Sequence, residues 1–183
     1  MVAADGPAPT SDEIARMLLK AGAVRFGEFT LASGEKSDVY IDVKRAWPDP
    51  ARLTLMARAL ASRVGREPRL AGMELGAVPL VVAVALATGR PYVVLRKAAK
   101  EHGTRQAFEG EIPRGERVLL IEDVTTTGGT LVRSVEIIRA AGGEVDRVLA
   151  VLDRGQGAAE RLAGIGVRLE PLLSMAELRG VRS

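Results

Sequence analysis

Four consecutive apolar residues, 118–121, lead directly into the sequence EDVTTTGGT. An uninterrupted apolar run of this length is typical of a strand that is buried on both faces of a parallel sheet. Apolar residues at helical spacing follow over 131–141, and Gly142 and Gly143 end that pattern. A further apolar run, 148–152, completes the order strand, helix, strand. This order predicts a βαβ unit, and therefore a parallel arrangement of the two strands.

The rest of the chain repeats this alternation of short apolar runs and helical stripes. We expect an N-terminal helix capped by Ser11 or Asp12 and ended by Gly22, and a C-terminal helix capped by Ser174. The other expected elements are a hairpin of strands 26–31 and 39–43, helices 53–65 and 79–87, strands 70–73 and 91–95, and an extended segment 167–173. The order predicts an α/β fold with a mostly parallel central sheet, helices on both faces, and a ligand at the carboxyl ends of the strands.

Length and composition limit the number of domains and the kinds of chemistry. A chain of 183 residues suits one substantial core but not two full domains of ordinary size. It contains no cysteine, which excludes disulfides, thiolate metal sites and a cysteine nucleophile, and a reducing cytoplasm is the expected setting. The N-terminal residues lack the pattern of a signal peptide, and the longest apolar stretch, 77–87, is about half of a membrane span. We therefore expect a cytoplasmic protein without a membrane partner.

The charge pattern does not favour nucleic-acid binding. The formal net charge is only +3, and the one dense basic cluster, RKAAKEHGTR at 96–105, contains no aromatic side chain. Proteins that bind single-stranded nucleic acid typically interleave basic residues with aromatic side chains that stack on bases. We expect no nucleic-acid partner.

The segment from Thr125 to Thr130 has the composition of a phosphate-binding loop. It offers hydroxyls and backbone N–H groups, and Gly128 and Gly129 allow the main chain to approach an anion at the positive end of the following helix. No GK[ST] sequence follows, so the loop lacks the lysine that holds the outer phosphates of ATP or GTP. A loop that only caps the helix is the alternative interpretation.

Two adjacent carboxylates, Glu122 and Asp123, precede this loop. Carboxylates beside a phosphate are repulsive unless they face other groups, and the two hydroxyls of a sugar diol are donors that such a pair accepts. Charges at the end of a buried strand also need partners, which disfavours the helix-capping alternative. A phosphate next to vicinal hydroxyls predicts a ribose 5-phosphate ligand.

The pattern of two hydrophobic residues followed by Glu-Asp-Val-x-Thr-Thr-Gly-Gly-Thr resembles the phosphoribosyl diphosphate motif of the type I phosphoribosyltransferases. Within them, the chain is most similar to the orotate phosphoribosyltransferases. Four further segments carry the resemblance: FGEFTLASGEKSDVYIDVKRA at 26–46, GMELGAVPLV at 72–81, VLRKAAKEHGT at 94–104, and the pair Asp153 and Arg154. The resemblance implies one domain over 1–183, with a hood from about 1–45 plus 155–183 and a core from about 46–154.

The activity implied by the resemblance is transfer of the 5-phosphoribosyl group from 5-phospho-α-D-ribose 1-diphosphate to orotate in pyrimidine biosynthesis. The residues implied to bind the sugar diphosphate are Arg96, Lys97, Lys100, His102, Glu122, Asp123, Val124, Thr125, Thr126, Thr127, Gly128, Gly129 and Thr130. Thr126 and Arg154 are implied to contact orotate, because a guanidinium can hold the orotate carboxylate that purine bases lack. Phe29 or Tyr40 would wall this pocket. The alternative for Arg154 is a surface arginine paired with Asp153.

The basic loop is the implied catalytic segment. Arg96, Lys97, Lys100 and His102 would stabilise the charge that grows on the leaving diphosphate. Mg²⁺ would bridge the diphosphate and the ribose hydroxyls with no direct protein ligand, since this ion keeps most of its water. The polar loop 97–110 is expected to move and to close over substrate, and the resemblance implies that it reaches a neighbouring subunit in a homodimer. A solvated charged surface is the alternative.

The chain departs from the family pattern at two positions. Many orotate enzymes carry a lysine just before the Ser-Gly turn and another in the diphosphate loop, where this chain has Ala32 and Leu75. Lys36 and Lys44 are candidates to compensate for the two missing charges.

Three other functions share parts of these features. A purine or xanthine phosphoribosyltransferase would share the motif but not Arg154 or the basic loop. A regulator that senses phosphoribosyl diphosphate would need a nucleic-acid-binding domain, for which 183 residues leave little room. A structural protein with a vestigial pocket is disfavoured because the acidic pair and the basic loop are both intact.

Overall fold

The protein is described by a computed structural model that covers residues 6–30, 34, 36–97 and 107–181. Its centre is a six-stranded sheet with the order β5-β4-β3-β6-β7-β8. The strands are β3 (Arg69–Met73), β4 (Tyr92–Leu95), β5 (Phe108–Glu109), β6 (Val118–Thr125), β7 (Arg147–Asp153) and β8 (Arg168–Ser174). All neighbours pair in parallel except β4 and β5, which confirms the predicted α/β architecture.

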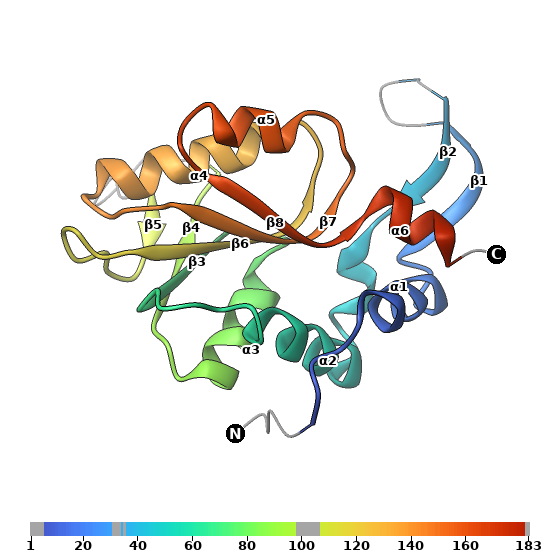
Figure 1. Ribbon diagram of the computed structural model, residues 1–183, viewed down its shortest axis with the longest axis horizontal. Coiled ribbons are helices and arrows are strands. Elements are labelled where there is room, and N and C mark those ends of the chain that lie inside the picture. Colours follow the sequence, from blue (N-terminus) through green and yellow to red (C-terminus); the bar gives the residue numbers. More distant parts are fainter. Residues whose placement is uncertain (1–5, 31–33, 35, 98–106, 182–183) are drawn as a thin grey trace.

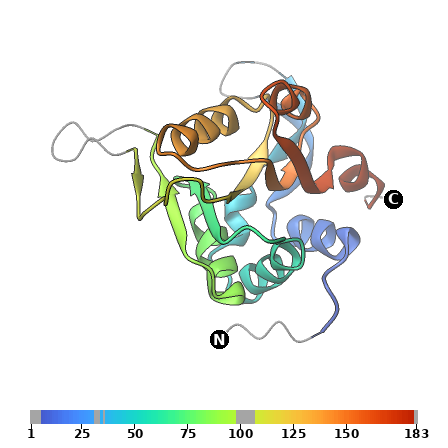
Figure 2. The ribbon, with the colours of Figure 1, turned by 60° about the vertical axis from the view of Figure 1, so that its left-hand side comes forward.

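Helices cover both faces of this sheet (Figures 1 and 2). One face carries α1 (Ser11–Lys20), α2 (Pro50–Ala61) and α3 (Val78–Thr88), and the other carries α4 (Gly129–Ala140) and α5 (Ala158–Ala163). Alternate residues of β6 supply the two cores, since Leu119 and Ile121 belong to one buried cluster and Val118 and Leu120 to the other. The unbroken apolar run at 118–121 is therefore buried on both sides, as predicted.

A smaller layer stands at one end of the sheet, where β1 (Val24–Thr30) and β2 (Lys36–Ile41) form the predicted antiparallel hairpin. The 3₁₀ helix η1 (Val43–Ala46) follows β2, and α6 (Met175–Gly180) ends beside the hairpin. Arg179 joins α6 to β2 through Asp38, with Nη1 2.7 Å from Oδ2. The segment 155–183, expected in the hood, also supplies β8 to the main sheet, so the division into hood and core stays a prediction.

Several predicted boundaries are wrong, each for a local reason. The N-cap of α1 is Thr10, not Ser11 or Asp12, because Thr10 and Glu13 form a reciprocal capping box. Helix α2 begins three residues earlier than expected, where Asp49 accepts hydrogen bonds from the N–H groups of Ala51 and Arg52. The expected strand 39–43 ends at Ile41, because the chain turns into η1. Helix α5 was not predicted.

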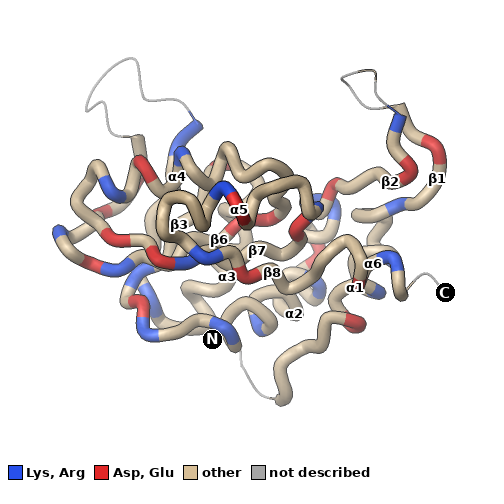
Figure 3. The backbone as a smooth tube through the Cα atoms, turned by 45° about the horizontal axis from the view of Figure 1, so that its top comes forward, with Lys and Arg blue, Asp and Glu red and all other residues tan. Residues whose placement is uncertain are grey.

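Opposite charges are interleaved along the backbone (Figure 3). Among the described residues, the most buried ion pair joins Arg147 on β7 to Glu67, with Nε 2.5 Å from Oε1. A second contact joins Arg147 to Glu170 on β8 at 2.8 Å. These contacts tie the start of β7 to β8 and to the segment before β3, at the end of the sheet opposite the carboxyl ends of its strands. In the described part of the chain, no helix has both the length and the apolar composition needed to span a bilayer.

Candidate active site

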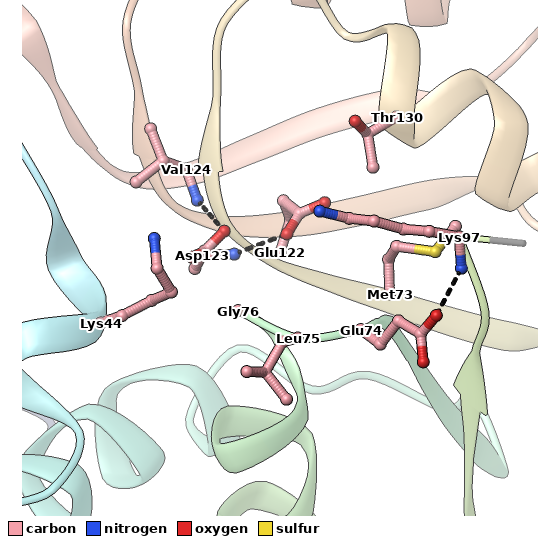
Figure 4. A pocket seen from close by; sticks show the side chains of 10 residues that line it. All are labelled: Lys44, Met73, Glu74, Leu75, Gly76, Lys97, Glu122, Asp123, Val124 and Thr130. Carbon is pink, nitrogen blue, oxygen red and sulfur yellow. Dashed lines mark hydrogen bonds between the residues drawn. The ribbon is translucent and has the colours of Figure 1, made fainter. Parts of the chain in front are cut away.

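Two adjoining cavities lie at the carboxyl ends of the central strands. Strand β3 pairs with β6 only as far as Ile121, and the chain after β3 then turns away through Glu74 and Gly76 into α3. Beyond Ile121, Glu122, Asp123 and Val124 therefore border a cavity on that side. The first cavity, of about 250 Å³, is lined by Lys44, Met73, Glu74, Leu75, Gly76, Lys97, Glu122, Asp123, Val124 and Thr130 (Figure 4).

The acidic pair lies within β6 rather than after it, because pairing with β7 continues to Thr125. Glu122 is only 6% exposed and borders both cavities, whereas Asp123 borders the first. Burial and the neighbouring Asp123 raise the pKa of Glu122 well above its ordinary value of 4.5, and the ammonium of Lys97 opposes this shift. The free protein therefore holds a carboxyl group here that readily takes a proton.

The predicted phosphate loop borders the second cavity, of about 200 Å³, whose lining includes every residue from Val124 to Leu131. Gly128 is the N-cap of α4 and has φ +76°, a left-handed conformation that favours glycine. A Cβ at this position would also lie 3.1 Å from Cα of Ala158 on α5. The loop thus presents the first turn of α4 to the cavity, an arrangement that suits an anion.

Two of the four predicted catalytic residues are described. Lys97 lines the first cavity, and its backbone N–H donates to Oε1 of Glu74 at 2.8 Å. Its ammonium points toward Glu122 (Figure 4). Arg96 forms an ion pair with Glu109 on β5 and does not line either cavity. Lys100 and His102 lie outside the described residues, as does most of the loop 97–110.

The predicted orotate contacts are placed less directly. Arg154 follows β7, is partly buried, and donates its backbone N–H to the carbonyl of Thr125 at 3.0 Å, which holds it beside the phosphate loop. It does not line either cavity, whereas Thr126 lines the second. Phe29 and Tyr40 pack together on the hairpin with ring centroids 5.7 Å apart. Asp153 is the alternative partner proposed for the Arg154 side chain. Its carboxylate accepts a hydrogen bond from the backbone N–H of Gly155.

The resemblance placed the segment 72–81 beside the diphosphate, but Glu74 and Gly76 were not singled out as site residues. Both follow strand β3, which neighbours β6, so they reach the same edge of the sheet as the acidic pair. Their position after an expected parallel strand was the available signal. Of the two lysines proposed to compensate for missing charge, Lys44 lines the first cavity, and Lys36 pairs with Thr30 at the far end of the hairpin.

No group of three or more His, Cys, Asp or Glu side chains that could hold a metal ion occurs among the described residues. The cavity does present carboxylate oxygens from Glu74, Glu122 and Asp123. Such hard oxygen donors suit magnesium, which is commonly held by one or two carboxylates together with substrate phosphates. The donor chemistry of the cavity therefore fits an ion that arrives with a phosphorylated substrate.

Comparisons with known proteins agree with this geometry. The phosphoribosyl transferase domain family matches residues 49–169. An orotate phosphoribosyltransferase of Pyrococcus furiosus is 44% identical over 91% of this chain and 94% of its own length. The crystal structure of orotate phosphoribosyltransferase from Aeropyrum pernix is 36% identical, with a TM-score of 0.81 over 91% of this chain and 96% of that one. The Mycobacterium tuberculosis enzyme in complex with 5-phospho-alpha-D-ribosyl 1-diphosphate is 33% identical, with a TM-score of 0.75 over 93% of this chain and 99% of that one. The chain therefore belongs to the phosphoribosyl transferase domain family and, within it, to the orotate phosphoribosyltransferases.

Proposed function

We propose that this chain transfers the 5-phosphoribosyl group of 5-phospho-α-D-ribose 1-diphosphate to orotate, which yields orotidine 5'-phosphate and diphosphate in pyrimidine biosynthesis. The observation that carries this proposal is the position of Glu122 between two cavities, one bordered by the Thr125–Thr130 loop and one by the turn after β3. A 5'-phosphate in the second cavity, beside the loop, and a diphosphate in the first, beside the turn after β3, would place the ribose over the acidic pair. The Mycobacterium relative that binds the same sugar diphosphate supports this choice of substrate.

In this proposal, the 5'-phosphate accepts hydrogen bonds from the N–H groups and hydroxyls of Thr125 to Thr130. The ribose hydroxyls donate to the carboxylates of Glu122 and Asp123. The raised pKa of Glu122 follows from its burial and from the nearby Asp123 in the free protein. Hydroxyl donors from the sugar would then supply the polar partners that the buried carboxylate needs.

Departure of the diphosphate requires positive charge on its side of the site. Lys97 points into the first cavity, and Arg96, Lys100 and His102 belong to the same basic segment. We assign the four side chains to stabilising the charge that develops on the leaving group. Mg²⁺ that enters with the phosphorylated substrate would neutralise part of that charge.

For the base, we assign the guanidinium of Arg154 to the orotate carboxylate and the hydroxyl of Thr126 to the ring. The hydrogen bond from the backbone N–H of Arg154 to the carbonyl of Thr125 holds the Arg154 backbone next to the phosphate loop. From there its side chain could reach a base attached to the bound ribose. A bidentate contact to a carboxylate would select orotate over purine bases.

We further propose a cytoplasmic homodimer in which the loop 97–110 of one subunit reaches the site of the other. An apolar surface formed by α2 and α3 supports a second copy as the partner, and we call it the α2–α3 face. It includes Leu53, Val82 and Leu86, and Leu86 is 63% exposed. It continues through Pro79 to Leu75, which also lines the first cavity, so a subunit docked there would lie beside the active site.

A panel of bases with magnesium and the sugar diphosphate tests the reaction. We expect activity with orotate and little with hypoxanthine, xanthine or adenine, measured by product formation. Activity with a purine base but not with orotate would reject the assignment. The variant Arg154→Ala should weaken the binding of orotidine 5'-phosphate much more than that of ribose 5-phosphate, and equal losses would remove Arg154 from its role.

A further inference from the structure

Lys44 is the second positive charge of the first cavity. Among the described residues that line this cavity, the cations are Lys44 and Lys97, against the carboxylates of Glu74, Glu122 and Asp123. Lys97 enters beside Glu122, and Lys44 enters from the opposite side, toward Asp123 (Figure 4). The two ammonium groups therefore flank the acidic pair from different elements of the fold.

The backbone of Lys44 is held firmly, while its ammonium pairs with a neighbouring carboxylate and stays accessible to a ligand. Val43 and Ala46, on the same short 3₁₀ helix, are fully buried and anchor it in the core. The side chain of Lys44 is 55% exposed, and Nζ lies 3.1 Å from Oδ1 of Asp42. Asp42 has a second cationic neighbour, Arg45, with Nε 4.0 Å from Oδ2, so its carboxylate keeps a counterion when Lys44 turns toward a ligand.

The position of Lys44 coincides with the place where a charge is missing from the turn after β3. Lys44, Leu75 and Gly76 line both the first cavity and the apolar cavity beside it. Leu75 is 74% exposed and contributes no charge. A polyanion bound at this turn would be repelled by the carboxylates of Glu74 and Asp123 unless a cation on the same side offset that repulsion. Hydrogen bonding to Asp42 and the field of Asp123 raise the pKa of Lys44, so its ammonium stays charged.

We propose that Lys44 binds the diphosphate of the substrate and replaces the charge that Leu75 does not supply. This inference rests on the proposed function, because it takes the turn after β3 as the diphosphate subsite. Lys44 acts on the leaving group from the η1 side of the cavity, and Lys97 acts from the β4 side. The base and the 5'-phosphate lie outside its reach.

Isothermal titration calorimetry with two probes tests this assignment. Inorganic diphosphate with magnesium occupies only the diphosphate subsite, and orotidine 5'-phosphate occupies the other subsites. The variant Lys44→Met should raise the Kd of diphosphate about tenfold or more, since a charge-assisted contact is lost. It should leave the Kd of orotidine 5'-phosphate within about twofold. The variant Lys20→Met, at the exposed end of α1, should change neither and serves as the matched control.

Two further variants separate loss of charge from loss of structure. Lys44→Arg keeps the charge and should retain most of the diphosphate affinity. Adding Leu75→Lys to Lys44→Met should restore it, because the exposed side chain at position 75 faces the same cavity.

The result that overturns the inference is unchanged diphosphate binding in Lys44→Met, or equal weakening of both probes without rescue by Leu75→Lys. Loss of diphosphate affinity in Lys36→Met instead would move the role to the hairpin. Failure of the wild-type protein to bind orotidine 5'-phosphate would reject the proposed function, and the diphosphate comparison would still decide the role of Lys44.

Discussion

Gly76 lies directly against the carboxylate of Asp123. A Cβ on Gly76 would come 2.2 Å from Oδ2 and 3.0 Å from Oδ1 of Asp123, both closer than side-chain atoms pack. The missing side chain allows the turn after β3 to approach the end of β6, where both segments border one cavity. The position of the second acid of the pair therefore depends on glycine at position 76.

Replacing Gly76 with alanine should displace Asp123 and weaken sugar binding while the fold persists. We expect the Kd of ribose 5-phosphate to rise about tenfold, the equivalent of one lost hydrogen bond to a charged group. Titration calorimetry measures this, with thermal unfolding as the check on folding. Gly180→Ala is the control, because a Cβ at position 180 meets no atom within 4 Å. Unchanged affinity in Gly76→Ala would mean that Asp123 does not hold the sugar.

Glu122→Gln should stabilise the free protein at neutral pH and weaken the binding of ribose 5-phosphate. Burial and Asp123 raise the pKa of Glu122, so the folded state binds more protons than the unfolded state between the ordinary value of 4.5 and the raised value. Stability from this group is therefore complete below about 4.5 and is lost as pH rises through the folded pKa. The glutamine variant lacks that loss, because its side chain carries no charge to be buried.

The difference in Tm between the glutamine variant and the wild type measures this effect. It should grow as pH rises above 4.5 and then level off above the raised pKa. Ribose 5-phosphate should bind the variant more weakly, because an amide accepts from hydroxyls less strongly than a carboxylate. A variant that is less stable than the wild type at every pH would show that Glu122 has a structural partner instead.

The sequence predicts the centre of this site better than its rim. The apolar run at 118–121 and the glycines at 128 and 129 identify a buried strand and an anion-binding turn, because both patterns are local. The continuation of β6 to Thr125 is not local. Glu122 and Asp123 are poor strand formers, and the pairing of Glu122, Val124 and Thr125 with β7 holds this segment extended.

The same limit applies to Lys44, Glu74 and Gly76. Each lies in a segment whose path depends on packing between distant elements, and nothing within a few residues of Lys44 shows that it faces the end of β6. Reciprocal contacts explain the misplaced cap of α1, since Thr10 and Ser11 are both good N-cap residues and Glu13 selects Thr10. The role of Arg154 is implied by the resemblance alone, and its contact with the orotate carboxylate stays a prediction.

Gly128→Ala should damage both stability and phosphate binding. Alanine at φ +76° costs about 1–2 kcal/mol, and its Cβ would crowd Ala158 at 3.1 Å from Cα. The matched control is Gly115→Ala, which has φ +75° but no atom within 4 Å of the added Cβ. Both variants should lose about 2–8 °C in Tm through the backbone term. Only Gly128→Ala should also lose affinity for inorganic phosphate, and equal phosphate binding in the two variants would show that the loop does not hold the anion.

Leu86→Glu should separate the proposed dimer by placing a charge in the α2–α3 face. Leu86 is 63% exposed and borders an apolar cavity with Leu53, Pro79 and Val82, so a glutamate there costs the single subunit little and would be unpaired at an interface. Sedimentation velocity should show a dimer for the wild type and a monomer for the variant. Ala159→Glu, at an exposed position of α5 on the other face of the sheet, should remain dimeric.

If the loop 97–110 acts in the partner subunit, the Leu86→Glu monomer should lose most of its turnover but still bind ribose 5-phosphate, whose proposed contacts lie on one chain. A monomeric variant with wild-type turnover would show that each subunit carries a complete site.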